Sequence, residues 1–96
     1  MSPIPLNDET RALAATLVWF EPPEVALADP VRFVAYAFAR ATHPQMKLLR
    51  SYVSEADMNH ALDNAPPGII DARSWAYWNA RAGKYPAPPM PVRRFG

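Results

Sequence analysis

The chain has 96 residues, of which half are hydrophobic and a fifth are charged, and its formal net charge is +1. This length allows one domain with a small core, and the composition is typical of a soluble globular protein rather than a disordered one. The absence of cysteine excludes disulfides and thiolate metal sites. The apolar runs are too short for a membrane span, and the first residues do not have the pattern of a signal peptide. We therefore expect a cytoplasmic protein.

Prolines divide the N-terminal third of the chain. A first helix is predicted to begin at a cap formed by Asn7 or Asp8 and to stop at residues 21–23, where two prolines follow a glutamate. Residues 23–27 can add a short turn of helix. The apolar positions expected on the first helix are Leu13, Leu17 and Phe20.

Three further helices are predicted from their N-caps. Asp29 stands before Pro30, an N-cap followed by proline at the first helical position. Thr42 and Ser54 each precede a glutamine or an acid by three residues, which is the pattern of a capping box. The apolar side chains that follow at helical spacing are expected to face the core: Val34, Ala37, Phe38, Ala41, Met46, Leu49, Tyr52, Val53, Met58, Ala61 and Leu62.

The last third of the chain predicts one more helix and an arm. Residues 66–68 favour an extended turn, Asp71 can cap a fifth helix, and Gly83 is placed to end it. Because no region alternates with a period of two, we predict an all-α fold: a compact bundle of about five short helices over residues 1–84. The arm, residues 85–96, is basic and expected to be extended and to pack back over the bundle, because it holds four prolines: Pro86, Pro88, Pro89 and Pro91.

No catalytic or metal-binding motif is found in the sequence. His43 and His60 lie 17 residues apart, without HExxH spacing or a convergent carboxylate. The three glycines never form a phosphate-binding loop. We expect capping or surface roles for both histidines, and we expect no enzymatic activity, metal or cofactor.

The charges are distributed unevenly along the chain. Residues 1–29 hold five acids and one base, whereas residues 73–96 hold five bases and no acid. Either the two ends pair with each other in the fold, or the basic end meets an acidic partner or a phosphate backbone. The basic side chains of the middle region are expected to form a solvated face: Arg40, Lys47 and Arg50.

Aromatic residues suggest a contact surface. Trp75 and Trp78 lie one turn apart on the last predicted helix, where they either anchor it to the core or present at least one side chain to a partner. Trp19 and Phe20 raise the same alternatives near the other end of the chain. The candidate partner-binding residues are Trp75, Trp78, Arg73, Arg81, Tyr85, Arg93 and Arg94.

Several segments follow one another in a distinctive order: LVWFEPPE over residues 17–24, DPVRF over 29–33, LLRSY over 48–52, SEAD over 54–57, and APPGIIDARSWAYWN over 65–79. This order resembles a family of small bacterial helical proteins encoded beside nucleotidyltransferase toxins of the AbiEii abortive-infection type. The resemblance covers roughly residues 15–92, and residues 65–79 are its most specific part. It implies an antitoxin-like protein of a toxin-antitoxin or phage-defence pair, which restrains the toxin by protein-protein contact and has no catalytic residues of its own.

A small nucleic-acid-binding regulator is the alternative. Its basic C-terminal third would contact phosphates, and Tyr85 and Phe95 would stack on bases. The nine acids of the chain and the lack of a helix-turn-helix with a basic recognition helix weigh against this alternative.

Overall fold

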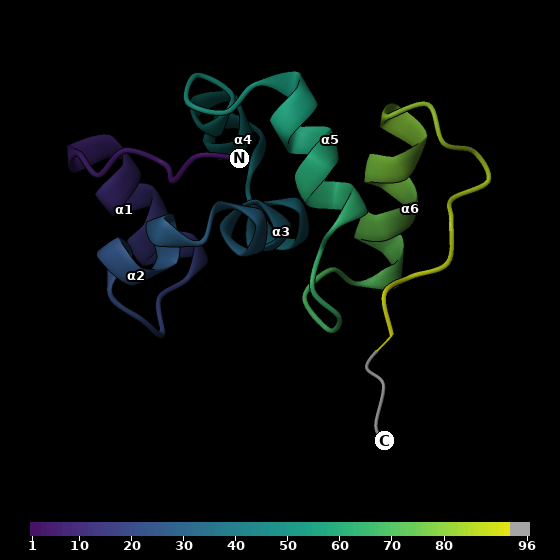
Figure 1. Cartoon of the computed structure of the whole chain (residues 1–96), viewed down its shortest axis with the longest axis horizontal. Helices are drawn as coiled ribbons and strands as arrows, with labels where there is room; N and C mark the ends of the chain where they lie inside the picture. The colour runs from purple at the N-terminus through teal and green to yellow at the C-terminus, as the bar shows by residue number, and fades with distance from the viewer. Residues whose placement is uncertain (93–96) are drawn as a thin grey trace.

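A computed structural model describes residues 1–92 of the chain, which form helices connected by short turns (Figure 1). No strand occurs in this part of the chain, so the predicted all-α fold is confirmed. The structure has one helix more than the five predicted, because the expected turn at Pro23 is a complete short helix. The helices are α1 Asp8–Leu17, α2 Pro23–Ala28, α3 Pro30–Arg40, α4 His43–Leu49, α5 Glu55–Asp63 and α6 Ala72–Arg81.

Helix α3 lies at the centre of the bundle. It contacts α1, α2, α5 and α6, and Figure 1 shows it between α1 and α2 on one side and α5 and α6 on the other. A helix that is apolar around most of its circumference is buried on several sides, which suits this position. Its buried side chains are Pro30, Phe33, Val34, Ala35, Ala37 and Phe38.

The helix starts follow the capping residues of the sequence. Asn7 and Thr42 form complete capping boxes, in which the side chain of each cap accepts a backbone N–H and the third residue of the helix accepts one in return. Ser54 accepts the N–H of Asp57 at 3.1 Å. Asp29 likewise accepts from the start of α3. These contacts satisfy N–H groups that have no partner within the helix.

Helix α1 ends earlier than the sequence predicts. It stops at Leu17, so Phe20 is outside the helix and 45% exposed rather than apolar core. Pro22 disfavours helical conformation at Glu21, which excludes a helix that runs through residues 21–23. In addition, Arg40 Nη1 donates to the Leu17 carbonyl at 3.0 Å and so satisfies an acceptor at the helix end.

The helix predicted to begin after Thr42 is also shorter than the spacing of its apolar residues indicates. Tyr52 and Val53 lie in the turn after α4 rather than on it. Val53 is nevertheless buried. The Tyr52 hydroxyl donates to Glu9 Oε1 at 2.6 Å, and this bond raises the pKa of Tyr52 because it favours the neutral phenol. The turn is thereby tied to the first turn of α1.

Helix α6 begins and ends at the predicted residues. Asp71 Oδ2 accepts the N–H of Ser74 at 3.2 Å. At the other end, Gly83 has φ of +85°, its N–H donates to Ala80 O, and the next N–H donates to Asn79 O. This pair of bonds is a Schellman motif, whose left-handed residue favours glycine.

The Asp71 cap makes the stability of α6 sensitive to acid. The pKa of Asp71 lies below its ordinary value because Ser74 hydrogen-bonds to the carboxylate through its side chain and its backbone. Such a group stabilises the fold above its unfolded pKa, and the contribution is lost as the pH falls through the folded pKa. We expect the melting temperature to fall more steeply in the native chain than in Asp71→Asn between about pH 5 and about pH 3, because asparagine caps without titrating. Parallel curves of melting temperature against pH would contradict this expectation.

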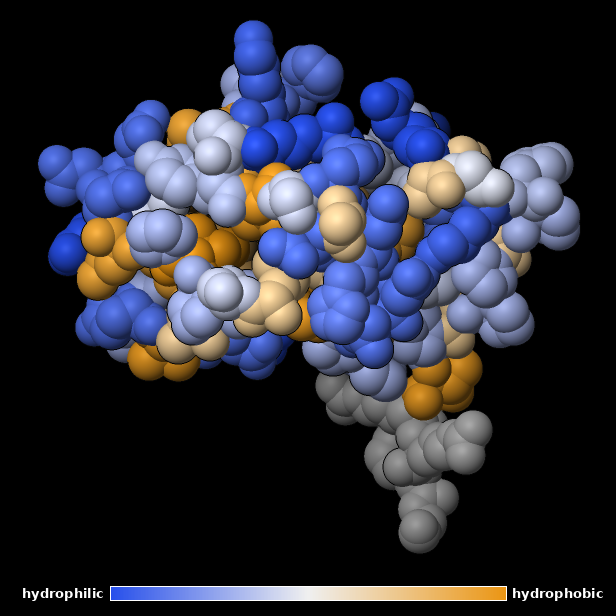
Figure 2. Space-filling view, turned by 45° about the horizontal axis from the view of Figure 1, so that its top comes forward, coloured by the Kyte–Doolittle hydropathy of each residue, from blue (hydrophilic) through white to orange (hydrophobic). Residues whose placement is uncertain are grey.

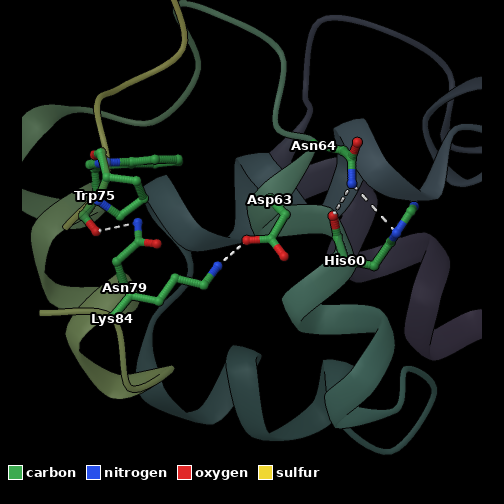
Figure 3. Close-up of polar contacts among 7 residues, drawn as sticks. His60, Asp63, Asn64, Trp75, Asn79 and Lys84 are labelled. Carbon is green, nitrogen blue, oxygen red and sulfur yellow. Dashed lines mark hydrogen bonds and ion pairs between the residues drawn. The ribbon is translucent and has the colours of Figure 1, made fainter.

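The described part of the C-terminal arm packs back over the bundle, as predicted. The indole N–H of Trp75 donates to Pro88 O at 2.7 Å, and Ala87 and Met90 pack against the core. Just before the arm, Lys84 forms an ion pair with Asp63 at the end of α5 (Figure 3). Within residues 1–92, no helix combines the length and the hydrophobicity needed to cross a membrane.

Candidate functional site

Side chains from α4 and α6 line a groove on the described surface. Its volume is about 150 Å³. A smaller hollow of about 70 Å³ adjoins it, shares Arg50, Trp78 and Arg81 with it, and extends to α5. We call the two together the α4–α6 groove. The larger hollow is lined by His43, Met46, Lys47, Arg50, Tyr77, Trp78 and Arg81.

Helical spacing explains which side chains reach the groove. On α6, Tyr77 and Arg81 are four residues apart and therefore share a face. The Arg81 guanidinium lies 5.8 Å from the centre of the Tyr77 ring. Lys47 on α4 and Arg50, which follows the last residue of α4, are three residues apart and exposed, while Met46 is buried. The groove thus has an apolar floor with cationic and aromatic edges.

Trp78 packs against Phe38 of α3 and also lines the groove. Its indole N–H donates to Phe38 O at 2.9 Å, and its ring lies 5.2 Å from the Phe38 ring. The opposite side of the residue is open, because Trp78 is only partly buried and lines both hollows. Tyr77 packs edge-on against it at 4.9 Å. The indole is therefore held in one orientation while part of it faces the groove.

The groove carries an excess of positive charge. Lys47, Arg50 and Arg81 belong to neither of the two ion pairs found in the described part of the chain. Glu55 lines the smaller hollow but is not within salt-bridge distance of these three cations. Arginine and lysine are charged at neutral pH, so the groove attracts an anionic group.

The structure brings together only part of the predicted partner-binding set. Trp78 and Arg81 line the groove, whereas Trp75 is 6% exposed and lies beneath the arm. Arg73 and Tyr85 are exposed but do not line it. Arg93 and Arg94 lie outside the described residues.

Five residues that line the larger hollow were missing from that set: His43, Met46, Lys47, Arg50 and Tyr77. Lys47 and Arg50 are exposed, as predicted for a solvated face, but Arg40 lies elsewhere, above the rings of Phe20 and Tyr36. The three-residue spacing of Lys47 and Arg50 could have indicated that they lie on one side of the helix. Only the packing of the two helices shows that they face Tyr77.

Within residues 1–92, the acidic and basic ends of the chain do not form ion pairs with each other. Neither ion pair joins residues 1–29 to residues 73–92, so the first interpretation of the charge asymmetry is wrong for the part of the chain that the structure describes. Figure 1 shows α1 and α6 at opposite ends of the molecule. Figure 2 shows hydrophobic patches gathered toward the α1 and α2 end and largely hydrophilic surface over α5 and α6. The acidic segment that contains α1 and α2 and the basic segment that contains α6 thus lie at opposite ends of the described part of the molecule.

Both histidines lie at the surface. His43 is exposed at the start of α4, and His60 is exposed near the end of α5, where the Asn64 side chain donates to its carbonyl at 2.9 Å (Figure 3). No group of three or more potential ligands gathers anywhere in residues 1–92.

Comparisons with protein-family models, with curated proteins and with solved structures found no match. The partner class implied by the resemblance therefore stays a prediction.

Proposed function

We propose that the chain is a protein-interaction module that binds an acidic surface of its partner in the α4–α6 groove. The observation that carries this proposal is the set of three cations without a carboxylate partner, Lys47, Arg50 and Arg81, beside two aromatic rings. Arginine, tyrosine and tryptophan are enriched among the residues that dominate interface energies. An anchored tryptophan also loses little conformational freedom when a partner binds.

The partner that the resemblance implies is a nucleotidyltransferase toxin, which the module would restrain. Carboxylates hold the metal ions and position the substrates of phosphoryl- and nucleotidyl-transfer enzymes. Arg50 and Arg81 can each form a bidentate pair with such a carboxylate, while Trp78 excludes water around the pair. Binding of this kind blocks the toxin by occupying the groups that its own substrate needs. Arg93 and Arg94, the predicted contacts in the arm, would add to the same charge.

Charge reversal in the groove is expected to abolish binding. We expect the double variant Arg50→Glu and Arg81→Glu to weaken partner affinity at least about 100-fold, because each reversal replaces an attraction by a repulsion worth over 1 kcal/mol. Both residues lie near helix ends, where reversal itself costs about 0.3–1 kcal/mol of stability. The measurement is co-purification and titration with the product of the neighbouring gene, which the resemblance implies is a nucleotidyltransferase, after circular dichroism has shown that the variant is folded.

Arg11→Glu is the matched control for each single reversal, Arg50→Glu or Arg81→Glu, because it changes the net charge by the same amount and Arg11 is an exposed arginine on α1, far from α6. Its affinity should be unchanged. Equal loss in the control would mean that net charge, not the groove, governs binding. If the native chain does not bind the proposed protein partner but binds DNA with an affinity that falls steeply with salt, the nucleic-acid alternative is correct and the proposal fails.

A further inference from the structure

The turn between α1 and α2 presents a second aromatic surface. Trp19 is 72% exposed and Phe20 is 45% exposed. The two rings pack edge-to-face at 5.5 Å, and Phe20 packs in the same manner against Tyr36 of α3 at 5.5 Å. We call these three aromatic residues, with Arg32 and Arg40, the Trp19 platform. It shares no residue with the α4–α6 groove.

The platform is rigid although it lies on a turn. Val18, directly before Trp19, is 1% exposed and fixes the chain in the core. Glu21, directly after Phe20, forms an ion pair with Arg32. Pro22 and Pro23 follow, and proline restricts its own backbone and that of the preceding residue. Trp19 is therefore exposed on a backbone that is already ordered, which lowers the entropic cost of docking a partner there.

Two arginines give the platform its charge. The guanidiniums of Arg32 and Arg40 lie 5.3 and 4.9 Å from the centre of the Tyr36 ring, and both lie 5.9 Å from that of Phe20. Glu21 neutralises Arg32, but Arg40 belongs to no ion pair in the described part of the chain. One Nη of Arg40 donates to Leu17 O, which leaves other N–H donors of its five for a ligand.

We propose that the Trp19 platform is a second docking surface, which binds a protein segment carrying an acidic side chain beside an aliphatic or aromatic one. The apolar side chain of that segment covers the exposed face of Trp19 and Phe20. Its carboxylate pairs with Arg40, the cation that the fold leaves unneutralised, so the charges of ligand and platform are complementary. The groove and the platform together make the chain a bridge between two acidic surfaces.

The three indole N–H signals of the ¹⁵N-labelled chain provide the test. The indole N–H of Trp75 donates to Pro88 O, and Trp75 borders neither docking surface, so its signal is the internal reference, and Trp19→Phe identifies the Trp19 signal. The probe is a twelve-residue peptide in which leucines alternate with aspartates. We expect it to shift the Trp19 signal saturably at concentrations up to about 1 mM, the range of weak transient binding. A matched peptide with lysines in place of the aspartates should leave that signal unchanged.

Two variants assign the interaction to the platform. Trp19→Ala removes an exposed side chain and should weaken peptide binding at least about tenfold, followed by fluorescence anisotropy of a labelled peptide. Arg40→Lys keeps the charge but removes the planar guanidinium, which can donate two parallel hydrogen bonds to a carboxylate, and it should weaken binding severalfold. Leu6→Ala, at a 46% exposed apolar residue outside the platform, should bind as the native chain does. No Trp19 shift at saturating peptide, an equal response to the lysine peptide, or unchanged binding by Trp19→Ala would overturn the proposal.

Discussion

Replacing Phe38 by alanine is expected to lower the free energy of unfolding by about 3–5 kcal/mol, the usual cost of truncating a buried aromatic side chain. Phe38 is 6% exposed on the central helix, and its ring lies 5.2 Å from that of Trp78. The backbone carbonyl of residue 38 survives the change, so the Trp78 indole keeps its acceptor. The loss therefore comes from the cavity and from the missing ring contact between α3 and α6.

The measurement is chemical denaturation followed by circular dichroism. A loss of this size is a large part of the roughly 5–15 kcal/mol that stabilises a typical domain. Tyr85→Ala, at an aromatic residue that is 88% exposed, is the control and should change stability by less than about 0.5 kcal/mol. A change below about 1 kcal/mol in Phe38→Ala would mean that α3 does not use this side chain to hold α6.

Removing residues 85–96 is expected to leave the helices folded but to lower the melting temperature by about 5–15 °C, since about 1–2 kcal/mol is lost and each kcal/mol shifts a domain of this size by about 4–8 °C. The deletion removes the acceptor of the Trp75 indole and the packing of Ala87 and Met90. Part of this loss is offset because the arm no longer has to be ordered. Tryptophan emission should move to longer wavelength as Trp75 becomes exposed to water.

Two outcomes would contradict this account of the arm. An unchanged melting temperature and emission would show that the arm does not cover Trp75, and loss of the helical spectrum would show that α6 depends on it. The deletion is also expected to weaken partner binding, because it removes Tyr85, Arg93 and Arg94. A shorter deletion of residues 93–96 tests the contribution of the two arginines separately, since the contacts of residues 85–92 remain.

The beginnings of the helices could be predicted from the sequence because capping is local. The bonds of Asn7, Thr42, Ser54 and Asp71 reach only three residues along the chain, so a short motif contains the whole interaction. The end of α1 could not be predicted in this way. The carbonyl of Leu17 at this end accepts a hydrogen bond from Arg40, which lies 23 residues further along the chain. No pattern near Leu17 reveals this contact.

The candidate site, too, could be predicted only where neighbouring residues in the sequence form it. Trp78 and Arg81 were predicted because aromatic and basic residues cluster in that segment, but their neighbours in the groove come from α4, a separate helix. Trp75 looks equivalent to Trp78 in the sequence. The fold distinguishes them, because the arm covers Trp75 while Trp78 borders the groove. Tertiary packing decides which member of such a pair a partner can reach.

Hydrogen-deuterium exchange of the chain, with and without the proposed nucleotidyltransferase partner, shows whether a protein binds in the α4–α6 groove. We expect slower exchange over residues 43–50 and 77–82 in the complex, because these segments border the groove and docking suppresses local opening. Arg50→Glu with Arg81→Glu should abolish that protection. Protection confined to the α1 and α2 end, or no protection by a partner that still co-purifies, would contradict the proposal.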